Sequence, residues 1–241
     1  MNKVFFRKMH DTVNSIFNLK MLIKPQKHRN LHFSCFIDFR KAFDCILRQK
    51  LFDKLGKKGV RGRFLDVLIS MYSNDKSAVK IDNKLTQSFT CHAGVKQGCM
   101  LSPTICNFYL NGLPKFLNTA SSTDIMLGDK SITVSYSDDL VIFSKSAKSL
   151  NLQIILNKLE SFCENADLSV NLDKTNIKIF NNSGKSLNNY SFRYGADELE
   201  NVKSYKYLGL IMSPYMETLI SLGKSSRKLH SKLSINYEKR W

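Results

Sequence analysis

The sequence is short of acidic residues. Asp and Glu together number 20 against 37 Lys and Arg, which gives a formal net charge of +17 at pH 7. A chain with this imbalance attracts polyanions, so nucleic acid is the favoured partner, although anionic membrane surfaces and acidic proteins also attract basic chains. The basic residues gather toward the two ends of the chain, and the acids that could take part in chemistry lie between them.

Zinc motifs and membrane-spanning segments are also lacking. None of the 6 cysteines forms a CxxC pair and the 5 histidines fit no zinc spacing, so no zinc site is expected. Cysteines used in this way are typical of a reducing, intracellular compartment, with nucleus and cytoplasm both open. No apolar run approaches transmembrane length and the N-terminus has no uncharged signal-peptide core, so no membrane partner is expected.

What is present is a hydrophobic content of 43% in 241 residues, enough for a sizeable core. Apolar residues recur at helical or strand spacing along the chain. Helices are expected at residues 12–23, 47–55, 64–72, 102–113, 148–166 and in the basic stretch from 217 onward. Strands are expected at residues 32–38, 78–81, 88–91, 177–180 and 205–211, and as a hairpin at 132–144. This mixture of strands and helices, with several hairpins, predicts an α+β fold.

Two adjacent acids, Asp138 and Asp139, form the expected turn of the apolar hairpin at 132–144. Like charges this close repel each other, and a divalent cation removes the conflict. Asp38 ends the expected strand at 32–38, and together with Asp138 it supplies the minimal ligand set for two-metal phosphoryl transfer. Taken alone, the pair is equally typical of an exposed turn, and Asp38 of a helix cap or a salt-bridge partner.

A polar loop with two glycines, Gly94 and Gly98, leads into the helix expected from residue 102. Ser102 is the expected N-cap of that helix and Pro103 lies in its first turn. Glycine permits close approach of the backbone, and a helix N-terminus favours negative charge. The loop is therefore able to hold a nucleotide or a template backbone, and a purely structural turn is the alternative.

These segments, taken in order, resemble the reverse transcriptases of LINE-like, non-LTR retrotransposons. The matching stretches are HDTVNSIF at 10–17, FIDFRKAFD at 36–44, GVKQGCMLSP at 94–103, YSDD at 136–139, VNLDKTNIKIF at 170–180 and YKYLGL at 205–210. The resemblance covers nearly the whole chain. It implies a right-hand polymerase palm, an antiparallel sheet packed on helices. The implied regions are a partial fingers segment at 1–34, the palm at 35–202, a primer-grip hairpin at 203–216 and the start of a thumb at 217–241.

The resemblance further implies an RNA-directed DNA polymerase that transfers dNTPs to the 3′-hydroxyl of a DNA primer on an RNA template. Asp38, Asp138 and Asp139 would hold two Mg²⁺ ions, or Mn²⁺, with the main-chain carbonyl of Phe39 as a further ligand. Phe43 would be the steric gate that excludes a 2′-hydroxyl, although a core position is the commoner fate of Phe.

The remaining implied roles concern nucleotide and primer. Gln97 and Gly98 would contact the incoming nucleotide and the template. Lys174 would lie near the triphosphate as a proton donor to pyrophosphate, or else be a solvated surface charge. A primer grip would be formed by Tyr207, Leu208 and Gly209, which could otherwise be an ordinary hairpin.

Two departures from the family pattern stand out. Ser137 occupies a position where the family commonly has Ala, and its hydroxyl needs a partner if it is buried. The family's fingers extend well upstream of the segment at 10–17, and the thumb stops soon after it starts. We therefore expect a piece of a longer reading frame, whose fingers, thumb or endonuclease parts lie elsewhere and would be required for polymerase activity. An inactive remnant that binds nucleic acid without catalysis is the alternative, and an unrelated structural or RNA-binding protein is a third reading.

Overall fold

The computed structural model describes residues 31–118, 132–136, 139–144, 149–181, 189–208, 210–212 and 219–221. The chain forms two compact units. The first unit comprises Met1–Arg40, Leu113–Asn165 and Ser169–Trp241, and the second comprises Lys41–Gly112 and Ala166–Leu168. The expected helix at 12–23 and most of the basic C-terminal stretch lie outside the described residues.

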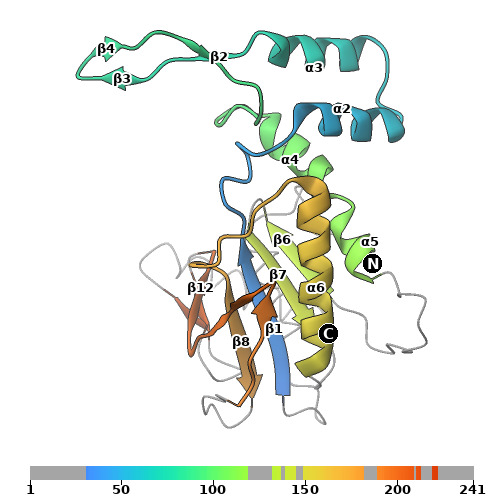
Figure 1. The fold of residues 1–241 in the computed structure, drawn as a ribbon, viewed down its shortest axis with the longest axis vertical. Helices are drawn as coiled ribbons and strands as arrows, with labels where there is room; N and C mark the ends of the chain where they lie inside the picture. The colour runs from blue at the N-terminus through green and yellow to red at the C-terminus, as the bar shows by residue number, and fades with distance from the viewer. Residues whose placement is uncertain are drawn as a thin grey trace, which may run out of the picture. The chain divides into compact units, whose positions relative to one another are not determined.

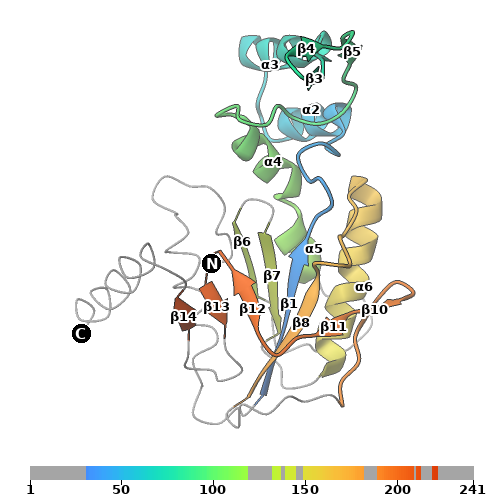
Figure 2. The same ribbon diagram turned by 90° about the vertical axis from the view of Figure 1, so that its left-hand side faces the viewer.

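The first unit is built on a five-stranded sheet with the order β11-β8-β1-β7-β6 (Figures 1 and 2). Its central strand β1 runs antiparallel to both of its neighbours, β7 and β8. The strands are β1 (Leu31–Asp38), β6 (Ile132–Tyr136), β7 (Asp139–Ser144), β8 (Asn176–Asn181) and β11 (Glu200–Asn201). The predicted strand at 32–38, the predicted hairpin at 132–144 and the predicted strand at 177–180 are therefore confirmed.

Strand β1 is buried on both of its faces, as its nearly continuous apolar sequence requires. Phe33, Cys35 and Ile37 point to one face, and Phe36 points to the other together with Asp38, because side chains alternate along a strand. Helix α6 (Ser149–Ala166), predicted at 148–166, runs alongside the sheet.

The Phe36 face of the sheet packs against a second, smaller sheet. The buried cluster on this face consists of Phe36, Val141, Phe143, Phe180, Tyr207 and Met212. The smaller sheet has the order β12-β13-β14, with β12 (Tyr205–Tyr207), β13 (Leu210–Met212) and β14 (Leu219–Ser221). The prediction of a strand at 205–211 is refined to the hairpin β12–β13. The helix predicted from residue 217 is wrong at its start, where Leu219–Ser221 pairs with β13.

The second unit contains three helices among its described residues, α2 (Arg48–Lys57), α3 (Arg63–Ser73) and α4 (Ser102–Leu110), which confirms the helices expected there. A β-arm connects α3 to the loop before α4 (Figure 1). It consists of β2 (Lys76–Ser77), β3 (Lys80–Ile81), β4 (Lys84–Leu85) and β5 (Phe89–Thr90). Its tip is a two-residue turn at Asp82 and Asn83, which both have positive φ, as a type I′ hairpin turn requires.

Three predicted boundaries are corrected. Leu101, not Ser102, is the N-cap of α4. Ser102 is already the first residue of the helix, and its hydroxyl donates to the carbonyl of Lys96 in the preceding loop. The helix predicted at 102–113 ends at Leu110, and a separate helix, α5 (Leu113–Asn118), follows.

The acidic turn is the third correction. Asp139 does not belong to the turn, since it is the first residue of β7 and pairs with Tyr136 of β6. The two residues between these strands, Ser137 and Asp138, lie outside the described residues. In the described part of the chain, no helix combines the length and the apolar character needed to cross a membrane.

Candidate functional site

Two acids that are a hundred residues apart in sequence meet at one end of the main sheet. Asp38, the last residue of β1, is the register partner of Asp139, the first residue of β7. Directly opposed residues of an antiparallel pair have Cα atoms about 4.5–5.5 Å apart. The sheet thus brings the first acidic motif beside the acidic pair. The predicted meeting of Asp38 with Asp138 concerns a residue outside the described set and stays a prediction.

A turn before β8 surrounds Asp38. The Asn171 Nδ2 donates to Oδ2 of Asp38 at 3.0 Å, and the Asn171 backbone N–H donates to the Asp38 carbonyl at 2.8 Å. The Asp38 backbone N–H in turn donates to the Thr175 hydroxyl at 3.2 Å. Lys174 Nζ lies 3.9 Å from the same Oδ2. Among the described residues, every side-chain contact of Asp38 therefore falls on Oδ2, and Oδ1 remains available to a ligand.

Asp38 and Lys174 differ in their exposure to solvent, which determines how strongly their charges interact. The Asp38 side chain is 24% exposed and the Lys174 side chain is 69% exposed. Solvent screens an ion pair of this kind, so the Lys174 ammonium adds little to stability. The predicted position of Lys174 beside a triphosphate stays a prediction, but the structure does place it at the acidic end of the sheet.

The carbonyl of Phe39 is directed by its β-bridge with Val170. The hydrogen bonds of that bridge come from the flanking residues, the Asp38 carbonyl and the Arg40 N–H. In such a non-hydrogen-bonded pair, the central residue's own N–H and C=O point away from the partner. The Phe39 carbonyl therefore points to the side of β1 on which β7 lies, the side of the second acid.

The residues around Asp38 also show what sequence reasoning missed. Asn171 and Thr175 belong to the segment VNLDKT, from which only Lys174 was singled out. The sequence does offer a weak indication of them, because a side-chain amide and a hydroxyl stand just before the apolar strand predicted at 177–180. Only the fold reveals that both of them contact the backbone or the carboxylate of Asp38.

In the second unit, the segment after Arg40 interlocks with the glycine loop. The backbone N–H of Gly94 donates to the Ile46 carbonyl at 2.9 Å, and that of Val95 donates to the Phe43 carbonyl at 2.8 Å. Gly94 has φ +83, and a Cβ at this position would lie 2.9 Å from the Cα and the carbonyl oxygen of Asp44. The loop thus needs a glycine at this close approach.

The side chains on this part of the loop are accessible. Gln97 and Gly98 are exposed and Phe43 is half-buried. The Gln97 amide donates to Oδ1 of Asp44 at 3.1 Å. The structure therefore brings the predicted gate residue Phe43 and the predicted nucleotide-contact residue Gln97 to adjoining segments of one unit.

The end of the glycine loop is electrostatically favourable for an anion. The backbone N–H of Leu101, at the start of α4, is the largest of several influences that lower the pKa of the Cys99 thiol. The Lys96 ammonium acts in the same direction. Both effects stabilise negative charge on the thiol, as is usual near a helix N-terminus. The expectation that the loop holds a nucleotide or a template backbone stays a prediction.

The predicted primer-grip residues lie at the hairpin β12–β13. Tyr207 is buried, and its ring centroid lies 5.7 Å from that of Phe36. Leu208 follows with φ +47 in the turn. Gly209 lies outside the described residues. Because Phe36 and Asp38 share a face of β1, the hairpin packs on the face that also carries the first acid.

The predicted site residues are thus divided between the two units. Asp38, Asp139, Lys174 and Tyr207 belong to the first unit, while Phe43, Gln97 and Gly98 belong to the second. The boundary falls between Arg40 and Lys41, within the motif FIDFRKAFD. The expectation that both groups form one nucleotide site stays a prediction.

Telomerases are among the solved structures that share this fold. Telomerase from Candida tropicalis in complex with a TWJ fragment of telomeric RNA superposes with a TM-score of 0.59 at 15% identity, covering 92% of this chain and 34% of that one. Apo telomerase from the same organism, truncated from its C-terminal domain, gives 0.58 at 13% identity, covering 91% and 41%. The molecule therefore shares the fold of these telomerase chains over most of its length.

The sequence comparisons agree with the fold. The profile of the family described as reverse transcriptase (RNA-dependent DNA polymerase) matches residues 2–212, and the chain belongs to this family. The Pol polyprotein of the type-2 retrotransposable element R2DM of Drosophila melanogaster is 29% identical over 76% of this chain and 18% of its own length. The RNA-directed DNA polymerase of the mobile element jockey of Drosophila funebris is 24% identical over 86% and 22%. The chain thus spans about a fifth of the length of these relatives.

Proposed function

We propose that the chain is the catalytic part of an RNA-directed DNA polymerase of a non-LTR retrotransposon, which adds dNTPs to a primer 3′-hydroxyl. Family membership supports the class of reaction. The register pair Asp38–Asp139 is the observation that carries the proposal, because it brings acids from two separate motifs to one end of a sheet. An RNA template and a DNA primer are the proposed partners, and the net charge of +17 suits both.

The acids would suit a pair of divalent cations. Asp38, Asp138 and Asp139, with the Phe39 carbonyl, would hold two Mg²⁺ ions, or Mn²⁺, since oxygen ligands and partial exposure suit these ions. Bound there, the cations would lower the pKa of the primer hydroxyl and offset charge that grows on the phosphate oxygens. Asn171 donates to one oxygen of Asp38, which would leave the other oxygen for a cation.

The second unit would supply contacts to the incoming nucleotide. Phe43 would lie beneath the sugar and clash with a 2′-hydroxyl, while Gln97 and Gly98 would contact the nucleotide and template. Lys174 would donate a proton to the departing pyrophosphate, and its exposed ammonium is accessible for that role. The hairpin with Tyr207, Leu208 and Gly209 would hold the primer end.

The division of the chain into polymerase regions is proposed from its membership of the reverse transcriptase family. The regions would be partial fingers at 1–34, the palm at 35–202, the primer grip at 203–216 and the start of a thumb from 217. The remaining fingers, thumb or endonuclease parts would lie on a longer parent reading frame. The six cysteines form no disulfide with one another. A reducing, intracellular compartment is proposed, with nucleus and cytoplasm both open.

RNA-templated primer extension by the purified chain, with Mg²⁺ and either dNTPs or rNTPs, tests the proposal. We expect extension with dNTPs and strong discrimination against rNTPs. Phe43→Val should weaken that discrimination by about 10–100-fold, because a smaller side chain leaves room for the 2′-hydroxyl. The ratio of kcat/KM values for dTTP and UTP measures the effect.

The matched control is Phe64→Val, since Phe64 is an exposed aromatic residue of the same unit. It should leave the ratio unchanged. Unchanged discrimination in Phe43→Val would remove the gate assignment. Tight binding of an RNA–DNA duplex without any extension would instead support the alternative, a retroelement remnant that binds nucleic acid without catalysis.

Asn171→Ala provides a separate test of the acidic centre. Loss of the 3.0 Å hydrogen bond frees the Asp38 carboxylate to rotate. We expect the Mg²⁺ concentration for half-maximal extension to rise about 10-fold, as for other partners of metal-binding groups. Asn157→Ala, at an exposed position on α6, is the control. An unchanged Mg²⁺ requirement would show that Asn171 does not orient Asp38.

A further inference from the structure

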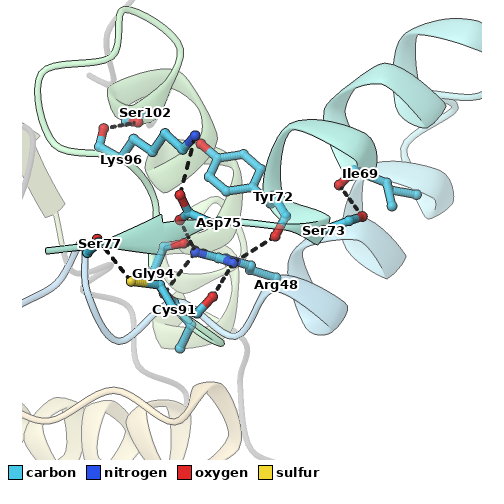
Figure 3. Close-up of polar contacts among 11 residues, drawn as sticks. Arg48, Ile69, Tyr72, Ser73, Asp75, Ser77, Cys91, Gly94, Lys96 and Ser102 are labelled. Carbon is cyan, nitrogen blue, oxygen red and sulfur yellow. Dashed lines mark hydrogen bonds and ion pairs between the residues drawn. The ribbon is translucent and has the colours of Figure 1, made fainter. Parts of the chain in front are cut away.

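Arg48, the first residue of α2, lies at the centre of a polar network in the second unit (Figure 3). Its guanidinium donates to three backbone carbonyls of the loop at residues 91–98, which contains Gly94 and Gly98. Nε donates to the Gly94 carbonyl at 2.9 Å, Nη1 to the Cys91 carbonyl at 2.6 Å and Nη2 to the Ala93 carbonyl at 3.1 Å. One side chain therefore binds the backbone of the loop just before Gln97 and Gly98.

The same guanidinium also binds the end of α3. Nη1 donates to the Tyr72 carbonyl at 2.9 Å, and Nη2 pairs with Oδ2 of Asp75 at 2.7 Å. Its central carbon lies 5.0 Å from the centroid of the Tyr72 ring. The other oxygen of Asp75 lies 3.3 Å from Nζ of Lys96 in the loop (Figure 3). Arg48 and Asp75 thus join α2, α3 and the loop.

The network around Arg48 is largely buried, so the loss of its hydrogen bonds would be costly. The Arg48 and Asp75 side chains are 10% and 12% exposed. Water cannot readily replace the guanidinium at so many carbonyls, and a carbonyl left without a donor in such a site is costly. The planar guanidinium offers five N–H donors in a fixed arrangement, whereas a lysine ammonium offers three from a single point.

We infer that Arg48 is a positioning residue for nucleotide binding, which holds the loop at 91–98 in the form that accepts the incoming dNTP. The inference rests on the proposed function of that loop. Arg48 would not contact the nucleotide, since its donors are all directed at carbonyls and at Asp75. Its effect would reach Gln97 through the backbone that it fixes at Gly94, where the loop already packs on Asp44.

The test compares Arg48→Lys and Arg48→Gln with the unaltered 241-residue chain. Hydrogen–deuterium exchange should rise at least 10-fold at residues 91–98 in both variants. The KM for dTTP in primer extension should rise about 10-fold or more, while kcat falls by less than threefold. A contact made equally in the ground and transition states changes KM alone, so this split identifies positioning of the nucleotide. A general loss of fold would lower the active fraction and thus kcat.

Arg61→Gln, at an exposed arginine between α2 and α3, is the matched control and should change neither quantity. Unchanged exchange at 91–98 in the Arg48 variants would overturn the inference, as would faster exchange with an unchanged KM. If the unaltered chain extends no primer, the proposed function fails, and equilibrium binding of dTTP decides the inference. Binding that Arg48→Gln weakens about 10-fold would support it, and no binding, or equal binding, would overturn it.

Discussion

Asp38→Asn should lower the rate of RNA-templated primer extension by about 10³-fold, the scale on which removal of a group that stabilises transition-state charge acts. The substitution removes the negative charge from the residue that pairs with Asp139 in the register of the sheet. It leaves the shape of the side chain intact, and the amide oxygen can still accept from Asn171. The fold should therefore survive. Single-turnover extension measures the rate of the chemical step, and urea unfolding shows whether the free energy of unfolding has changed.

Asp173→Asn is the matched control for this loss. Asp173 is an exposed acid of the same turn that contains Asn171 and Lys174. Its substitution should change extension by less than twofold. Asp138→Asn should behave like Asp38→Asn if the predicted meeting of these acids is correct. Extension that survives in either the Asp38 or the Asp138 variant would contradict the assignment of the acidic centre.

The sequence predicted the main strands because burial leaves a strong local pattern. Strand β1 reads as an almost unbroken apolar run that ends in an acid, and it is the central strand of the sheet. The hairpin β6–β7 has the same character. The sequence predicted a meeting of Asp38 with Asp138, which lies outside the described residues. The structure shows that Asp38 pairs with the neighbouring Asp139 on the adjacent strand.

The parts that the sequence did not predict depend on contacts between distant segments. The sequence pattern placed Ser102 at the N-cap, whereas Ser102 is the first residue of the helix and its hydroxyl donates to the carbonyl of Lys96. Arg48 looks like any surface cation in a helix, and only the folded loop supplies its carbonyl partners. Asn171 likewise reaches the Asp38 carboxylate only because the β-bridge between Phe39 and Val170 brings their two segments together.

The two glycines of the loop before α4 also show what the sequence alone does not predict, because their backbone angles are similar but their surroundings differ. Gly94 has φ +83 and Gly98 has φ +81. A Cβ at Gly98 would meet nothing within 4 Å, whereas a Cβ at Gly94 would lie 2.9 Å from backbone atoms of Asp44. The sequence motif shows both glycines as equivalent turn residues, and the fold distinguishes them.

Gly94→Ala should therefore lower the free energy of unfolding by roughly 2–5 kcal/mol, which combines left-handed strain with a backbone clash. Gly98→Ala should lower it by about 1–2 kcal/mol, because only the strain applies. Urea unfolding followed by circular dichroism measures both. The clash in Gly94→Ala also pushes the loop away from Asp44, so the KM for dTTP should rise with it. Equal losses of stability in the two variants would show that Gly94 is not the point at which the loop packs against the Phe43–Asp44 turn.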